Sequence, residues 1–158
     1  MIQQPDLLAG RHDAGLPPQP PVVVASRSGW LPPTLPFFHQ PLSRWLLCPT
    51  QPTCGPGRGF VRVLRGEADQ AGLVSLGAAG LQRLVVLGGA RLAASLLAAD
   101  LIDAIQLTIC PRLFGGEGLW LPPGPSLPAL SHWQALAPRS LGAGETLLVW
   151  QRPNRSAG

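Results

Sequence analysis

The sequence predicts a single α/β domain over residues 1–158, with a mostly parallel central sheet flanked by helices and antiparallel strands at its C-terminal edge. Strand-like apolar runs alternate with helical patterns through the middle of the chain, which is typical of a parallel sheet covered by helices. Two further strand-like runs close the chain around the turn Gly142-Ala143-Gly144 and favour an antiparallel pair. Hydrophobic residues make up 46% of the 158 residues, enough for the core of one domain.

The individual elements follow from hydrophobic periodicity and from glycine and proline, which number 19 each. Short apolar or alternating runs predict strands at residues 22–25, 44–48, 60–64, 83–87, 104–110, 133–137 and 146–150. The spacing of leucine and alanine predicts helices at residues 68–79 and 90–99. Proline-rich or polar stretches predict loops at residues 1–20, 30–41, 49–59 and 121–128, and a frayed end over residues 152–158.

The most informative stretch begins with the apolar run 84–87, which stops at Gly88-Gly89 and passes at once into a helical pattern. The first turn of such a helix carries backbone N–H groups without intrahelical acceptors, and glycine allows a phosphate to approach them closely. The stretch therefore indicates a site for a nucleotide phosphate. The alternative is that both glycines serve only the geometry of a strand-to-helix turn.

Charge and composition exclude several classes of protein. The net charge is +4 and all 12 basic residues are arginines, which excludes a Walker A lysine and a Schiff-base lysine. The arginines are scattered without a basic stripe, so we expect no nucleic-acid partner. No apolar run is long enough to span a membrane and the N-terminus lacks a signal-peptide pattern, so we expect a cytoplasmic protein. The three cysteines and three histidines show no metal-ligand spacing, so no metal is expected.

Four segments occur in an order and spacing that resemble a known family. They are residues 85–92, 96–97, 101–103 and 107–116, the last ending in a second glycine pair. The chain resembles the reductase domain of bifunctional riboflavin biosynthesis proteins of the RibD type, which has the dihydrofolate reductase-like fold. Residues 22–28 resemble the family's strand that ends in a Ser-Arg turn, and the closing strands resemble its last strands.

The resemblance implies an enzyme, an NADPH-dependent oxidoreductase of riboflavin biosynthesis. Its substrate is a small phosphoribosyl-pyrimidine, 5-amino-6-(5-phosphoribosylamino)uracil, whose opened ribosyl group takes a hydride at C1′ to give the ribitylamino compound. The chemistry of its guanidinium group adds Arg27 as a partner of the cofactor's 2′-phosphate; the alternative is a solvated turn residue. The other implied cofactor-binding positions are Ser26, Gly88, Gly89, Ala90, Arg91, Leu92, Ala93, Ala94 and Ser95.

The sequence also departs from the family. The Ser-Leu-Asp-Gly-like motif with which the family's domain begins is absent, so we expect the N-terminal part of the domain to be missing or to lie upstream. The zinc signature of a deaminase domain is absent as well. Among the substrate-binding positions, Leu7 fits the family, Arg11 stands one place late, and Leu87 replaces a glutamate.

Three functional hypotheses follow from these departures. The first is a reductase of the riboflavin pathway. The second is a reductase of the same fold that acts on a different, pterin-like substrate, which Leu87 favours. The third is a non-catalytic or truncated relative. If the first strands are absent, apolar side chains such as Leu84, Val86 and Ile109 are left uncovered, and we expect a homodimer or aggregation.

Overall fold

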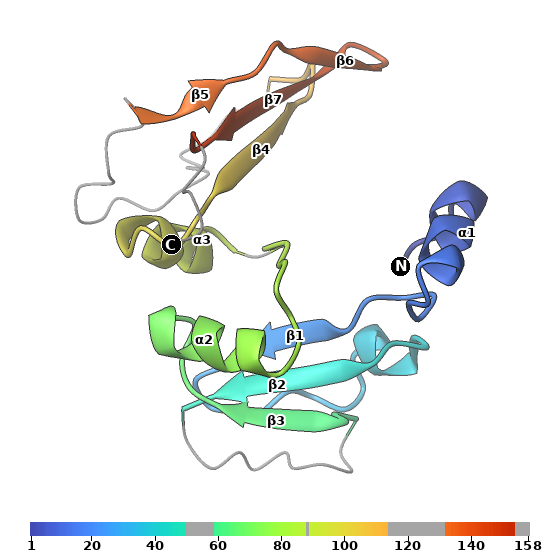
Figure 1. The fold of residues 1–158 in the computed structure, drawn as a ribbon, viewed down its shortest axis with the longest axis vertical. Coiled ribbons are helices and arrows are strands. Elements are labelled where there is room, and N and C mark those ends of the chain that lie inside the picture. The colour runs from blue at the N-terminus through green and yellow to red at the C-terminus, as the bar shows by residue number, and fades with distance from the viewer. Residues whose placement is uncertain (50–58, 88, 114–131, 154–158) are drawn as a thin grey trace. The chain divides into compact units, whose positions relative to one another are not determined.

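The computed structural model describes residues 1–49, 59–87, 89–113 and 132–153 (Figure 1). The chain forms two compact units, Met1–Leu84 and Val85–Gly158, and each is described by itself. The first unit contains a parallel sheet and the second an antiparallel one, so the predicted α/β class is confirmed. No helix in the described segments is long and apolar enough to cross a membrane.

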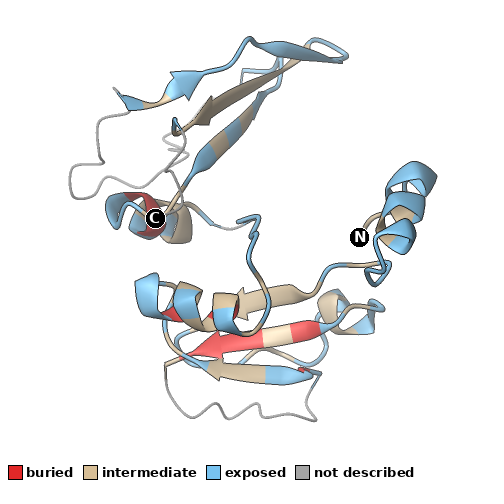
Figure 2. Ribbon diagram, in the orientation of Figure 1, coloured by how far each residue is buried: buried red, intermediate tan, exposed pale blue. Residues whose placement is uncertain are grey.

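A three-stranded parallel sheet forms the centre of the first unit. Its strands are β1 (Val22–Ala25), β2 (Arg44–Cys48) and β3 (Arg62–Arg65), in the order β1-β2-β3. The three predicted strands are confirmed, and β2 matches its predicted range at both ends. Its buried residues Leu46, Leu47 and Cys48 explain why it reads as an unbroken apolar run: both faces of this central strand are covered (Figure 2).

The two faces of β2 pack differently. Leu46 and Cys48 form a core with Phe60, against which Val24, Leu31, Phe37, Phe38 and Val63 pack. Leu47 points to the other face, toward helix α2 (Gln70–Ala78). There α2 approaches the turn after β3 so closely that a Cβ on Gly72 would lie 1.9 Å from the carbonyl oxygen of Glu67. Only glycine fits at position 72, and Asp69 caps the helix by accepting a hydrogen bond from the Gly72 amide at 2.9 Å.

A buried arginine holds the connection from β1 to β2, which includes the 3-10 helix η1 (Pro36–His39). Arg44 is 9% exposed, and its guanidinium group donates to the carbonyl oxygen of Phe37 at 2.9 and 3.1 Å and to that of Leu42 at 3.1 Å. It also donates to the carbonyl oxygen of Gln40. The guanidinium carbon lies 5.2 Å from the centre of the Phe37 ring and 5.8 Å from that of Phe38. One side chain thus satisfies three carbonyl groups of an irregular segment.

The second unit consists of one helix and an antiparallel sheet. Helix α3 (Ala90–Ala98) is followed by β4 (Ala104–Ile109), β5 (Gln134–Ala135), β6 (Arg139–Gly142) and β7 (Glu145–Gln151). The sheet order is β4-β7-β5, and β6 also pairs with β7. The turn predicted at residues 142–144 joins β6 to β7, and all three of its residues have positive φ, between 50° and 91°.

Arg152 fixes the end of β7 to the turn that follows α3. Its Nε donates to the carbonyl oxygen of Ile102 at 2.7 Å, and its two terminal nitrogens bind the Asp100 carboxylate. Its guanidinium group also lies 5.0 Å from the centre of the Trp133 ring. Asp100 has a φ of 62°, so the chain passes through a left-handed conformation just after α3. The ion pair with Arg152 holds Asp100 in this conformation.

Three sequence-based expectations about the elements are wrong. Residues 1–20 contain helix α1 (Pro5–Asp13), which proline at its first turn, Asp6 near its start and basic residues in its last turn favour. β4 does not join the parallel sheet. It pairs antiparallel with β7, in a register that runs from Ala104 opposite Gln151 to Ile109 opposite Thr146. β6 was not expected, since its sequence neither alternates nor forms an apolar run.

A further error concerns residues 83–87, which form no strand. Val85 is 84% and Leu87 is 93% exposed, and this segment pairs with no strand in the described part of the chain. A β-branched apolar run becomes a strand only when it forms hydrogen bonds with a neighbouring strand. Composition alone therefore predicted a strand here that the fold does not contain.

We expect Arg44→Lys to lower the free energy of unfolding of the first unit by about 2–3 kcal/mol, because an ammonium group cannot reach all three carbonyl groups and unpaired buried acceptors are costly. The matched control is Arg62→Lys on the exposed start of β3, where the guanidinium group lies 4.7 Å from the Trp45 ring centre and the expected loss is below about 1 kcal/mol. Urea denaturation followed by tryptophan fluorescence measures both. Equal losses would contradict the role given to Arg44.

Candidate functional site

The carboxyl ends of the three parallel strands meet at one edge of the first unit's sheet. Ser26 follows β1 and Gly66 follows β3, and both extend the ladder: the Ser26 amide donates to the carbonyl oxygen of Leu47 at 3.0 Å and the Gly66 amide to that of Cys48 at 3.1 Å. Ligands of open α/β sheets bind outside this edge. We therefore take it as the candidate site of the first unit.

The turn after β1 is built by two serine side chains. The Ser26 Oγ accepts a hydrogen bond from the Gly29 amide at 3.1 Å, and the Ser28 Oγ accepts one from the Trp30 amide at 3.3 Å. Gly29 is buried with a φ of 65°, which favours glycine at this turn. Within the described segments the Ser26 hydroxyl accepts this hydrogen bond and donates none, so its proton can be donated to a ligand.

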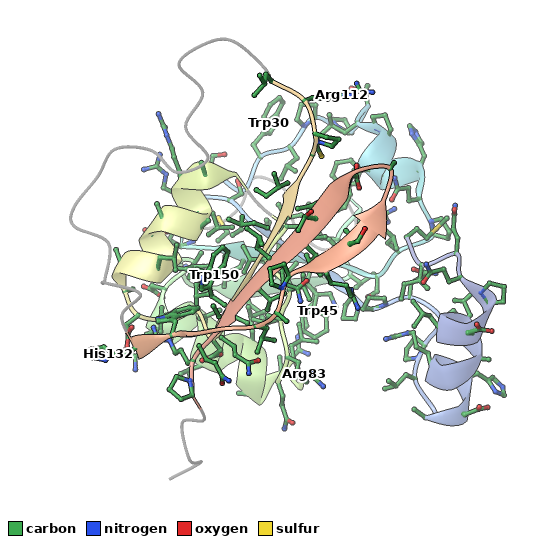
Figure 3. All side chains as sticks on the ribbon, turned by 90° about the horizontal axis from the view of Figure 1, so that it is seen from above. Trp30, Trp45, Arg83, Arg112, His132 and Trp150 are labelled. Carbon is green, nitrogen blue, oxygen red and sulfur yellow. The ribbon has the colours of Figure 1, made fainter. Side chains whose placement is uncertain are left out.

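Arg27 lies between these serines with an exposed side chain, while its carbonyl oxygen lies 3.7 Å from the Cys48 Sγ. The backbone of Arg27 is thus held against the buried end of β2, while the residue as a whole is exposed. Trp30, 57% exposed, borders the same turn (Figure 3). Backbone anchoring beside an exposed cation suits recognition of an anionic group.

The second unit has a candidate site of its own at the start of α3. Gly89 precedes the helix with a φ of −57°, and its carbonyl oxygen accepts from the amides of Leu92 at 3.0 Å and Ala93 at 3.2 Å. A Cβ on Gly89 would have no atom within 4 Å, so the space beside it is open. The first amide groups of the helix face this end without intrahelical acceptors. Gly88 lies outside the described residues, as does the second glycine cluster at residues 115–118.

The other predicted positions on α3 differ in exposure. Arg91 and Ser95 are exposed, whereas Leu92, Ala93 and Ala94 are half-buried, as is Ala90 at the helix start. The Ser95 hydroxyl donates back to the Leu92 carbonyl oxygen at 2.9 Å, a contact within the helix. The strand that was expected to lead into this helix is absent, so the predicted strand–glycine–helix unit is present only in its helical half.

The three predicted substrate positions are all outside strands. Leu7 lies on α1 and is 52% exposed, and Leu87 is 93% exposed. Arg11, also on α1, donates from Nε to the carbonyl oxygen of Pro17 at 2.8 Å, which folds the following loop back on the helix. Each unit is described by itself, so α1 and the Ser26 turn belong to the first unit and Leu87 and α3 to the second.

Two observations concern the titratable side chains of the described segments. No group of three metal-ligating side chains occurs there. Partial desolvation and the nearby Glu145 carboxylate, whose Oε1 lies 3.6 Å from Sγ, raise the pKa of the Cys110 thiol. A raised pKa disfavours the thiolate, the reactive form. Cys54 lies outside the described residues.

Sequence reasoning did not single out Arg65, the last residue of β3. It pairs in register with Cys48 and immediately precedes Gly66, so it ends at the same sheet edge as the Ser26 turn. The signal available in the sequence was an arginine at the end of a predicted strand, followed by glycine. Only the register of the sheet shows that this arginine lies at the same edge as the Ser26 turn.

Comparison with known proteins gives one family. The model of the RibD C-terminal domain matches residues 2–146 of the chain. No curated protein matches it in sequence.

Two solved structures are similar in fold. A pyrimidine reductase-like protein from Corynebacterium diphtheriae has 16% identity and a TM-score of 0.71, over 98% of this chain and 69% of that one. A protein assigned to riboflavin biosynthesis from Shewanella sp. PV-4 has 21% identity and a TM-score of 0.53, over 72% of this chain and 62% of that one. At these identities the likeness shows the shared fold, and this chain spans about two thirds of the length of both proteins.

Proposed function

The chain belongs to the RibD C-terminal domain family, and from this we propose that it is an NADPH-dependent reductase of riboflavin biosynthesis that converts 5-amino-6-(5-phosphoribosylamino)uracil to the ribitylamino compound. The observation that carries the proposal is the family match over residues 2–146. The fold shared with a pyrimidine reductase-like protein supports the same class of reaction.

Each unit, taken by itself, has residues that suit a phosphate group of NADPH. The Ser26 hydroxyl retains a proton for a phosphate oxygen, and Arg27 presents an exposed guanidinium group beside it. At the start of α3, the open space beside Gly89 leaves room for a pyrophosphate next to the helix amides. Bound NADPH supplies the hydride for the reduction at C1′.

In the proposed mechanism the residues of this chain bind and orient the phosphate groups of the cofactor. Ser26 donates a hydrogen bond to the 2′-phosphate and Arg27 pairs with its charge, which distinguishes NADPH from NADH. The first amide groups of α3 bind the pyrophosphate through hydrogen bonds and the positive end of the helix dipole. Within each unit these contacts orient the phosphate group that they bind, and orientation is the protein's main contribution to hydride transfer.

Leu87 supports a second candidate, a reductase of the same fold with a pterin-like substrate. A leucine cannot accept the hydrogen bonds that a carboxylate at this position would accept from a sugar hydroxyl. A third candidate, a non-catalytic relative, predicts no cofactor binding. The exposed apolar residues 84–87 support the proposal that the chain forms a homodimer.

We expect Arg27→Ala to weaken NADPH binding about tenfold or more and to leave NADH binding nearly unchanged, because only NADPH carries the 2′-phosphate. Arg83→Ala is the matched control, since it removes the same charge from an exposed position of the same unit (Figure 3). Calorimetric titration of both cofactors measures the effect. Equal losses for NADPH and NADH would rule out this role of Arg27, and no binding of either cofactor to the unaltered chain would favour the non-catalytic relative.

We expect Gly89→Val to abolish NADPH binding while the chain stays folded. The negative φ and the open space permit the larger side chain, which then fills the volume proposed for the pyrophosphate. Gly77→Val in α2 is the control, because a Cβ there also meets no atom within 4 Å. Circular dichroism beside the titration separates folding from binding. A folded Gly89→Val that binds NADPH normally would contradict the proposal.

The substrate is tested at Leu87. Since this side chain is 93% exposed, Leu87→Glu places no buried charge and we expect an unchanged melting temperature. If the pyrimidine substrate is correct, steady-state turnover of 5-amino-6-(5-phosphoribosylamino)uracil rises in the variant, because an unpaired hydroxyl costs about 1–3 kcal/mol and the glutamate pairs it. Leu87→Gln, which is polar but uncharged, separates the effect of charge from that of polarity. Turnover of a pterin substrate alone would support the second candidate.

A further inference from the structure

Arg65 and Ser26 lie in one row of the parallel sheet. The face of the sheet is identified by three residues that are partners in register and pack together, Val24, Leu46 and Val63. Two residues further along each strand, side chains return to the same face. Cys48 and Arg65 are therefore on that face, and Ser26 follows it where the ladder continues.

The spacing suits a shared small anion. Neighbouring strands lie about 4.8 Å apart, so the Cα atoms of Ser26 and Arg65, two strands apart, are separated by roughly 10 Å. A serine hydroxyl and the long side chain of an arginine together span this distance with a phosphate group between them. The residue between them, Cys48, is fully buried, so the group lies beyond the end of β2 rather than above it.

The charge of Arg65 is available for a ligand. Arg65 is exposed, and the ion pairs found in the described segments, His12 with Asp13 and Asp100 with Arg152, do not involve it. Glu67 follows two residues later and is also exposed, yet no ion pair joins it to Arg65 in this part of the chain. By contrast Arg62, on the same strand, already lies against the Trp45 ring at 4.7 Å.

The backbone that carries Arg65 is held firmly. Gly66, with a φ of 148°, lies under Gly72 of α2, and a Cβ on Gly66 would meet the Gly72 Cα at 3.3 Å. The Gly66 amide donates to β2, and the Asp69 cap fixes the start of the helix. The arginine therefore projects from a turn that is fixed on both sides.

From this arrangement we infer that Arg65 is a specificity-determining residue that binds the adenosine 2′-phosphate together with Ser26, in addition to the contact proposed for Arg27. This inference rests on the proposed function, since it names a further contact of the same cofactor. A phosphate monoester carries close to two negative charges above pH 6, and two arginines balance that charge better than one. NADH, which lacks this phosphate, makes no contact with Arg65.

The test uses two probes with equal numbers of phosphates, adenosine 2′,5′-bisphosphate and adenosine 5′-diphosphate. In calorimetric titrations of the whole chain, Arg65→Gln weakens the 2′,5′-bisphosphate about tenfold or more and changes 5′-diphosphate binding less than twofold. Arg62→Gln, the matched control on the same strand, changes neither. Because Arg65 is exposed, the variant folds normally, which far-ultraviolet circular dichroism checks.

A pH series gives a second measurement. The 2′-phosphate gains a proton as the pH falls through about 6, so binding to the unaltered chain weakens toward pH 5. Without one of its two arginines, Arg65→Gln shows a smaller weakening. Normal binding of the 2′,5′-bisphosphate by Arg65→Gln would overturn the inference and leave the proposed function intact. Failure of the unaltered chain to bind either NADPH or the 2′,5′-bisphosphate would overturn both.

Discussion

The first unit depends on one side chain, the guanidinium group of Arg44. Parallel strands cannot be joined by a tight turn, so β1 and β2 need a long crossover, and here that crossover contains only one short 3-10 helix. Carbonyl groups of this crossover therefore lack regular hydrogen-bond donors. The guanidinium group of Arg44, in the central strand, donates to them instead. The same contacts place Phe37 and Phe38 over Leu46 and Cys48, and so close the core beneath the sheet edge that carries Ser26.

Much of the fold was readable from the sequence, and the failures have two different causes. The strands at 44–48 and 104–109 were found because burial of β2 on both faces and of β4 on alternate positions leaves a direct trace in residue type. Residues 83–87 show the same apolar pattern but form no strand, because a strand needs a neighbouring strand, which composition does not reveal. Helix α1 was missed for the opposite reason: none of its residues is buried, so it shows no apolar periodicity.

The candidate site divides in the same way. Ser26, Arg27 and Gly89 follow from local patterns, a polar turn after an apolar run and a glycine before a helix. The structure places Ser26 and Arg27 in a turn after β1 and Gly89 directly before α3, and their binding roles stay a proposal. Arg65 could not be found in this way, because its position in the same row as Ser26, with Cys48 between them, comes from the register of three strands. Sequence thus predicts the residues of turns and helix starts, while contacts across a sheet require the fold.

The close packing of Gly72 against Glu67 has a consequence for recognition. Binding usually requires a loop to give up many conformations, and this loss of entropy is subtracted from the affinity. The segment from Arg65 to Asp69 has already lost that freedom when the domain folds, since helix and strand leave no room between them for even one methyl group. An anion held there orders one arginine side chain and nothing else, so modest contacts are sufficient for useful selectivity.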